Sequence, residues 1–125
     1  MKYQFEKKGK YTMVHITGNI DTAESTRHLD NEIAAMVTEG HLHFVFNLEK
    51  TTYLDSAGIS IFIHCLCYVQ EKNGSIFIVA QDNQVKRVLE MVGINRLIAT
   101  YDSLQDFYDT QNAVNSATPP PSAGQ

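Results

Sequence analysis

The feature that most constrains the fold is the alternation of short apolar runs with longer segments of helical periodicity. Residues 44–48 and 76–80 are almost entirely apolar, which is typical of strands buried on both faces of a sheet. Each run is followed by a segment, at 57–72 and 84–92, in which apolar residues recur at helical spacing. Strands that alternate with helices predict an α/β domain with a mostly parallel sheet.

The N-terminal part predicts an antiparallel hairpin at one edge of this sheet. Residues 3–6 and 11–16 alternate apolar and polar side chains on either side of a short turn at 8–10. The second strand ends at Gly18-Asn19-Ile20-Asp21, before a helix. The polar segment 49–54, after the first buried strand, is interpreted as a loop.

Helix caps mark the boundaries of the remaining elements and give the order β-β-α-β-α-β-α-β-α, with about four helices. A short strand is expected at 97–101, and the last helix carries Leu104 and Phe107. The expected N-caps are Asp21 or Thr22, Asp82 or Asn83, and Asp102 or Ser103, and the expected helix stops are Gly40, Asn73-Gly74 and Gly93.

Composition places the chain among ordinary folded domains and excludes several classes. Its 125 residues, 43% of them hydrophobic, fit one domain with a substantial core. A net charge of −4 argues against a basic surface for nucleic acid or for anionic lipid. The longest apolar-leaning run, residues 59–69, is far shorter than the ~20 residues of a membrane span. Without a signal-peptide pattern at the start, a cytoplasmic protein with no membrane insertion is expected.

The C-terminal segment has a different composition from the rest of the chain. Residues 110–125 carry three prolines, small polar side chains and no charge. This composition predicts a flexible tail, so that the folded domain spans residues 1–109.

The sequence lacks the motifs of common catalytic and cofactor sites. It has no glycine-rich phosphate loop, no nucleophile elbow and no cysteine–histidine set at metal-binding spacing, so neither a metal nor a cofactor is expected. His41 and His43 are interpreted as solvated loop histidines. For His15 and His64 the sequence identifies no oriented partner, which general acid–base catalysis requires. An enzyme is therefore the weakest interpretation.

The most distinctive segment is Leu54-Asp55-Ser56-Ala57-Gly58, between a buried strand and a helix. Asp55 and Ser56 are both favoured N-cap residues, so the segment can serve simply to start the helix. Alternatively, a phosphate on Ser56 would lie at the helix N-terminus, where backbone N–H groups favour an anion, and would add about −1.5 to −2 charges. A serine nucleophile with Asp55 as its base is disfavoured, because adjacent side chains on a tight turn seldom point at each other.

The helix after this segment carries two apolar stripes. A second stripe, formed by Ile61, Cys65 and Tyr68, accompanies the stripe expected to face the sheet. A helix that is apolar nearly all round is covered either by a neighbouring helix or by a partner protein, and both alternatives stand. The residues expected to face the sheet are Ile59, Phe62, Ile63, Leu66 and Val69.

Several segments together resemble the STAS domain of anti-sigma factor antagonists. Residues 46–49 and 53–59 resemble the signature of the family, and Gly18-Asn19-Ile20-Asp21 is similar to its turn before the first helix. Residues 85–94 and 101–107 are similar to its third helix and to the start of its last helix. The resemblance covers residues 3–109 in order, and it implies a STAS-type sheet with helices chiefly on one side.

The resemblance implies that Ser56 is a phosphorylated serine, near Asp21, Asp55, Ala57 and Gly58. In the family, the unphosphorylated protein binds an anti-sigma factor that is also a serine kinase, and a sigma factor is thereby released. Phosphorylation ends the binding, and a PP2C-type phosphatase restores it. The implied partner surface comprises Asn19, Ile20, Asp21 and Ser56 and continues onto the stripe of Ile61, Cys65 and Tyr68. The chain is thus expected to be a binding switch, as a monomer or weak dimer.

Two other functions stay open. STAS domains also serve as subunits of membrane lipid ABC transporters, where Ser56 would be a plain contact residue. A STAS signalling module can also act on a response-regulator phosphatase rather than on a sigma factor.

Overall fold

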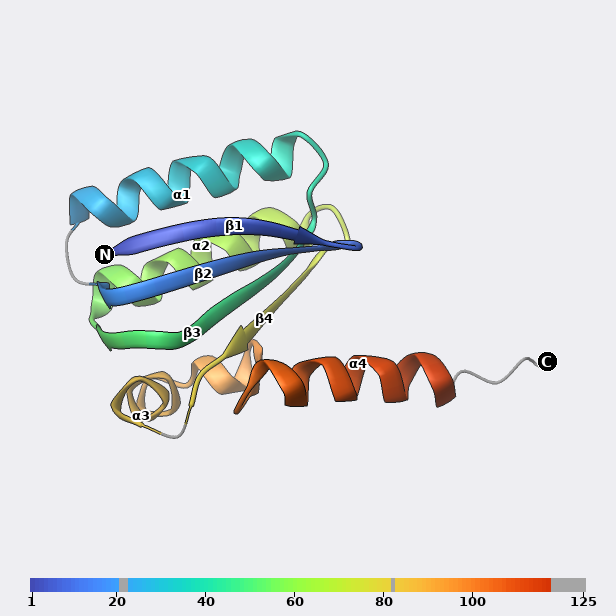
Figure 1. The fold of residues 1–125 in the computed structure, drawn as a ribbon. Coiled ribbons are helices and arrows are strands. Elements are labelled where there is room, and N and C mark those ends of the chain that lie inside the picture. Colours follow the sequence, from blue (N-terminus) through green and yellow to red (C-terminus); the bar gives the residue numbers. More distant parts are fainter. Residues whose placement is uncertain (21–22, 82, 118–125) are drawn as a thin grey trace.

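The computed structural model describes residues 1–20, 23–81 and 83–117 (Figure 1). The predicted order of strands and helices is confirmed. The elements are β1 (Lys2–Lys8), β2 (Tyr11–Ile20), α1 (Ala23–Thr38), β3 (His43–Leu54), α2 (Ser56–Gln70), β4 (Ser75–Val79), α3 (Gln84–Met91), the 3-10 helix η1 (Ile94–Arg96), β5 (Ala99–Tyr101) and α4 (Leu104–Ala117).

The strands form one mixed sheet in the order β1-β2-β3-β4-β5. β1 and β2 pair antiparallel, and the pairs from β2 to β5 are parallel. Each parallel connection passes through a helix, as parallel neighbours require. The predicted parallel sheet with an antiparallel hairpin at its edge is therefore confirmed.

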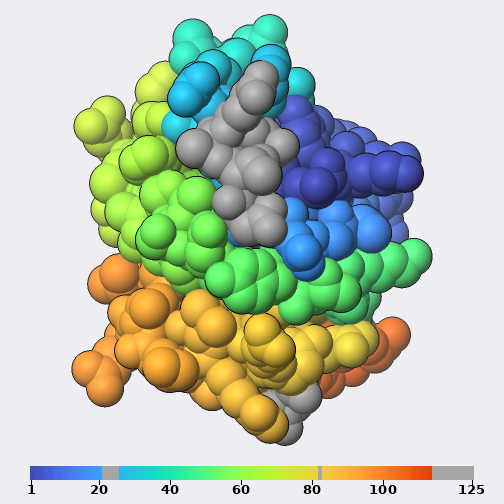
Figure 2. Space-filling model, turned by 90° about the vertical axis from the view of Figure 1, so that its left-hand side faces the viewer, coloured from blue at the N-terminus to red at the C-terminus, as the bar shows by residue number. Residues whose placement is uncertain are grey.

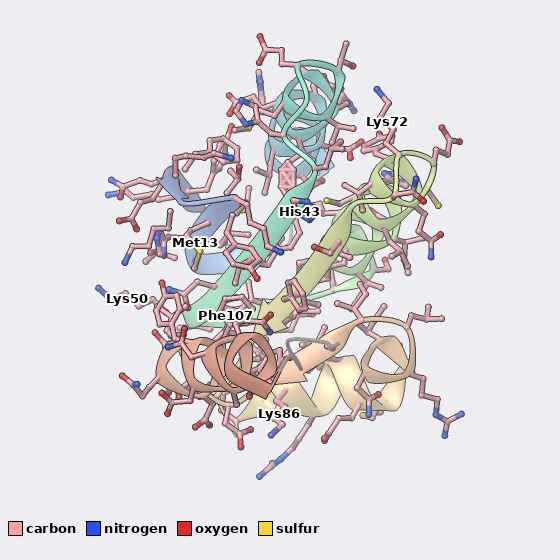
Figure 3. All side chains as sticks on the ribbon, turned by 90° about the vertical axis from the view of Figure 1, so that its right-hand side faces the viewer. Met13, His43, Lys50, Lys72, Lys86 and Phe107 are labelled. Atoms are coloured by element: carbon pink, nitrogen blue, oxygen red, sulfur yellow. The ribbon has the colours of Figure 1, made fainter. Side chains whose placement is uncertain are left out.

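Helices cover the two faces of the sheet unequally. α1, α2 and α3 pack on one face, over side chains such as Phe46 and Ile78. α4 packs on the other face, where Phe107 shares a second buried cluster with Met13 and Val45. Figure 3 shows Phe107 on α4, with Met13 on the sheet. Because successive side chains of a strand point to opposite faces, β3 and β4 supply both cores, which explains their continuous apolar runs.

Helix caps lie mostly where the sequence placed them. The Asn83 side chain caps α3 by accepting from the backbone N–H of Val85 at 2.9 Å. The Ser103 hydroxyl accepts from the N–H of Asp106 at 3.0 Å, at the start of α4. Gly40 and Gly93 adopt φ of +99° and +81° just after α1 and α3. The alternative caps Asp21, Thr22 and Asp82 lie outside the described residues.

Residues 49–54 are strand and not the predicted loop. β3 continues through them beside the second half of β2, so that Leu54 lies opposite Ile20. The buried Thr51 donates its hydroxyl proton to the carbonyl oxygen of Ile16 at 2.8 Å. The loop prediction was wrong because β2 forms strand hydrogen bonds with this polar segment, and the local sequence does not show which strand will lie beside it.

The last helix is longer than the sequence indicated. α4 extends to Ala117, so residues 110–117, predicted as tail, are helical. The first proline of this region is Pro119, so no helix breaker precedes Ala117 and the polar composition was misleading. The last strand is shorter than expected, since η1 precedes Ala99. Across the described ranges, no helix combines the length and apolar character that crossing a membrane would need.

Candidate functional site

The junction of β3 and α2 presents Ser56 as the first residue of the helix. Asp55 is extended, with φ −122° and ψ −161°, and one carboxylate oxygen accepts from the N–H groups of Ala57 at 2.9 Å and Gly58 at 3.4 Å. The side chain of Ser56 is exposed and makes no hydrogen bond with any residue that the structure describes. Asp55 therefore provides the cap, and the Ser56 hydroxyl is left open to solvent.

Gly58 permits a close approach between α2 and the end of β2. A Cβ atom at this buried position would lie 3.0 Å from Cγ2 of Ile20, 3.1 Å from its carbonyl oxygen and 3.1 Å from Cβ of Leu54. The N–H of Asp55 also donates to the carbonyl oxygen of Ile20 at 3.3 Å. These contacts fix the position of Ser56 relative to the sheet.

The residues of β2 that the sequence predicted as partner contacts differ in their exposure. Asn19 is exposed, and its side-chain oxygen accepts from the hydroxyl of Thr52 at 2.6 Å. Ile20 is fully buried, so its predicted role as a partner contact is wrong, and it supports the site from below. Asp21 lies outside the described residues. In Figure 2 the surface of the β3–α2 junction, in green, lies between those of α1 above and α3 below.

Tyr53 belongs to the exposed surface but was missed by the sequence reasoning. It lies three residues before Ser56, opposite Asn19 on β2, and 40% of it is exposed. Aromatic residues such as tyrosine are enriched in protein interfaces. The signal that could have identified Tyr53 was an aromatic residue within a polar segment. It was overlooked because the segment was interpreted as a loop.

The second apolar stripe of α2 faces α1 instead of solvent. Ile61 and Cys65 are buried to 1% and 0% exposure, in the core shared with α1. Tyr68 is half-buried, and its hydroxyl is 3.4 Å from the Asp30 carboxylate on α1. The predicted role of Ile61 and Cys65 as partner contacts is therefore wrong, and the alternative, a neighbouring helix, is correct. The sequence showed that the stripe is covered but not by what.

A shallow groove of about 240 Å³ runs between α1 and α2, next to the site. Ser60 and His64 follow Ser56 at intervals of one helical turn, and both line this groove. The ring Nδ1 of His64 lies 3.2 Å from the carboxylate of Asp30. The other lining residues are Thr26, Arg27, Asp30 and Ile61. The exposed Ser56, the half-buried Ser60 and the exposed His64 thus form a row of polar side chains along α2.

The family model of the STAS domain matches residues 2–107, from β1 into α4. The chain belongs to the STAS domain family. Both the expected family and the expected STAS fold are confirmed.

Named relatives of this STAS domain include anti-sigma factor antagonists. The anti-sigma-B factor antagonist of Staphylococcus aureus is 24% identical over 89 residues, which cover 71% of this chain and 82% of the relative. A solved anti-sigma factor antagonist from Mycobacterium paratuberculosis has a TM-score of 0.76 at 22% identity, over 91% of this chain and 93% of that one. The Bacillus protein SpoIIAA, solved in its phosphorylated form, has a TM-score of 0.69 at 14% identity, over 87% and 98%.

Three histidines of this STAS domain, His15, His43 and His64, have partners that the sequence did not reveal. His64 contacts Asp30, and His15 contacts Glu6 and Asn47. His43 begins β3 instead of lying in a loop, and its Nδ1 lies 2.7 Å from the hydroxyl oxygen of Ser75. Burial lowers the pKa of His43, and the positive charges of two nearby lysines lower it further. Within the described residues, no three His, Cys, Asp or Glu side chains gather as metal ligands.

Proposed function

We propose that this STAS domain is an anti-sigma factor antagonist whose binding to an anti-sigma factor is switched by phosphorylation of Ser56. The observation that carries the proposal is the division of roles at the β3–α2 junction. Asp55 caps the helix, so the Ser56 hydroxyl is exposed and can be modified without losing the cap. The name of the Staphylococcus aureus relative and the phosphorylated form of SpoIIAA support the same assignment.

Phosphorylation would change the surface charge at this point more than it would change the fold. The Ser56 oxygen bonds to the γ-phosphorus of ATP as the bond from that phosphorus to ADP breaks, so that ADP and the hydroxyl proton are released. The product carries about −1.5 to −2 charges beside the Asp55 carboxylate. Asp55 already occupies the N–H groups of Ala57 and Gly58, so those groups cannot compensate the phosphate fully. The new charge therefore remains on the surface that a partner must cover.

The partner surface of this proposal follows the exposed residues. Asn19, Tyr53 and Ser56 form its centre, and the groove with Ser60 and His64 extends it along α2. Burial of an uncompensated phosphate against a protein costs several kcal/mol, which corresponds to a loss of affinity of two or more orders of magnitude. The unphosphorylated protein binds the anti-sigma factor, and a PP2C-type phosphatase restores this state. The protein acts by binding, in the cytoplasm, as a monomer or weak dimer.

The first test is the modification state of the protein in its native cells. Intact mass and peptide mapping under several growth and stress conditions should show one phosphoryl group on Ser56. The variant Ser56→Ala should lose it, and Ser60→Ala, one turn further along α2, should keep it. A chain that stays unmodified in all conditions contradicts the switch and favours a constitutive docking subunit.

The second test is affinity for the anti-sigma factor kinase of the same organism. Ser56→Ala should bind as tightly as the unmodified protein, and Ser56→Glu should bind at least ~100-fold more weakly. Isothermal titration calorimetry measures all three forms. Equal affinities would overturn the proposal.

A further inference from the structure

α4 leaves part of its face of the sheet uncovered, and a hollow of about 290 Å³ lies there over β1, β2 and β3. His15 of β2 lines this hollow, with 28% of its side chain exposed. The hollow is also lined by Gln4, Glu6, Ile16, Thr17, Asn47 and Lys50. Ser56 is not among its lining residues, and the switch described above makes no use of it.

His15 is held by a hydrogen bond on each ring nitrogen. Its Nε2 lies 2.8 Å from a carboxylate oxygen of Glu6, and its Nδ1 lies 2.9 Å from the amide nitrogen of Asn47. The side-chain oxygen of Asn47 accepts from the backbone N–H of Glu49 at 3.1 Å. Because that N–H can only donate, the amide orientation of Asn47 is determined. Its NH₂ group therefore donates to Nδ1, so His15 is neutral with its proton on Nε2, toward Glu6.

Glu49 connects this arrangement to α4. The register of β2 and β3 shifts just after His15 and Asn47, so Glu49 has no paired residue on β2. The Asn47 side chain provides a partner for its N–H. The Glu49 carboxylate, in turn, accepts from the N–H of Leu104, the first residue of α4, at 3.2 Å. A carboxylate at this position is favourable, because the N-terminus of a helix carries partial positive charge.

We infer that His15 is a pH-sensitive link between the open face of the sheet and the N-terminus of α4. A protonated ring carries a proton on Nδ1 that points at the NH₂ group of Asn47, donor against donor. The Asn47 amide must then rotate so that its oxygen accepts from His15. Its NH₂ group consequently turns toward the N–H of Glu49, which loses its acceptor. The backbone at Glu49 loosens, and so does its hold on Leu104.

The charges around His15 act in both directions. Glu6, on β1, gains an ion pair when the ring is protonated and so favours the charged form. Lys8 lies 4.0 Å from Glu6 and weakens this gain. Lys2 and Lys50 line hollows that His15 also lines, and their positive charges disfavour the charged ring. The negative charge of Glu49, whose N–H is bonded to Asn47, favours it. Protonation therefore strengthens the contact of His15 with Glu6 and removes the hydrogen bond between Asn47 and the N–H of Glu49.

The test is a titration of the full chain by nuclear magnetic resonance. Imidazole ¹⁵N shifts should show the Nε2–H tautomer of His15 at high pH. The amide signals of Glu49 and Leu104 should shift with the same midpoint as His15. The protection factor of the Glu49 amide, which corrects the exchange rate for its intrinsic dependence on pH, should be roughly tenfold lower on the acidic side of that midpoint, as for the loss of one hydrogen bond.

Two variants separate His15 from other titrating groups. In the variant His15→Gln, the new side chain can accept from Asn47 and donate to Glu6 at every pH. The pH-dependent change in the amide signals of Glu49 and Leu104 should therefore vanish. His28→Gln, on an exposed position of α1, should leave it intact. A transition that persists in His15→Gln overturns the inference. If that variant does not fold, the wild-type titration decides alone. Amide signals of Glu49 and Leu104 that do not share the midpoint of His15 then overturn the inference.

Discussion

At the residue scale, three neighbouring side chains of the site have separate roles. Asp55 caps α2, Ser56 faces solvent and Gly58 allows the helix to approach β2. A serine that itself capped the helix would need its oxygen for backbone N–H groups, and its modification would disturb the helix start. Because Asp55 takes that role, the exposed hydroxyl is available at small structural cost.

Gly58→Ala should destabilise the protein, because the added Cβ would meet the backbone of Ile20 and Cβ of Leu54 at 3.1 Å. We expect a loss of about 1–3 kcal/mol in the free energy of unfolding, typical of overpacking. Urea denaturation measures it. Ser56→Ala, exposed in the same turn, is the control and should change stability by ~0.5 kcal/mol or less. A Gly58→Ala protein as stable as wild type would contradict the close approach.

The two cysteines should differ in reactivity. Burial raises the pKa of the Cys65 thiol strongly, with a contribution from Asp30, whereas Cys67 is exposed. The thiolate is the reactive form, so a raised pKa leaves Cys65 protonated and slow to react. Iodoacetamide at pH 8, followed by peptide mass spectrometry, should label Cys67 well before Cys65. Comparable rates would indicate that the α1–α2 core opens readily.

At the element scale, the two faces of the sheet have different roles. α1 and α2 pack together on the face that carries Ser56 at its end, and their contact buries Ile61 and Cys65 of the second apolar stripe of α2. α4 alone packs on the opposite face, through a smaller core centred on Phe107. The placement of α4 therefore depends on few side chains.

Phe107→Ala should loosen α4 selectively. The ring is fully buried and lies 5.2–5.4 Å, between centroids, from those of Tyr11, Phe77 and Tyr101. We expect a loss of about 3–5 kcal/mol in the free energy of unfolding, as for other large cavities. Asp109→Ala, at an exposed position of the same helix, should cost ~0.5 kcal/mol or less. Similar unfolding midpoints for the two variants would contradict the anchoring role of Phe107.

At the scale of the whole molecule, the proposed switch alters the surface of a fold that stays rigid. Ser56 lies at the surface, while the contacts below it, from Ile20 and Leu54, are buried. A charge added at Ser56 has no core contact to break. Its effect is therefore expected in binding rather than in stability.

Ser56→Glu should thus keep the fold. Its urea midpoint should correspond to a change of ~0.5 kcal/mol or less, as for an exposed substitution. Changes in amide chemical shift should be confined to the residues around positions 19 and 53–60. Shifts that spread to α4 or β5 would contradict a local surface switch and indicate a conformational change.

Much of the fold could be predicted from local sequence. Continuous apolar runs predicted β3 and β4, helical periodicity predicted α2 and α3, and Asn83, Ser103 and two glycines marked helix ends. The sequence also singled out Asp55, Ser56 and Gly58. These features depend on backbone hydrogen bonding and steric limits within a few residues, which the local sequence determines.

The tertiary structure alone decided what each side chain meets. It showed that residues 49–54 pair with β2, that α1 covers Ile61 and Cys65, and that Asp55 rather than Ser56 caps α2. It also brought His15 to Asn47, 32 residues away along the chain. Such contacts depend on which elements become neighbours. Many distant segments of a sequence could pair with a given polar strand or cover a given apolar stripe equally well. Local residues therefore determined the elements and the position of the site, and packing determined which residues are free to bind.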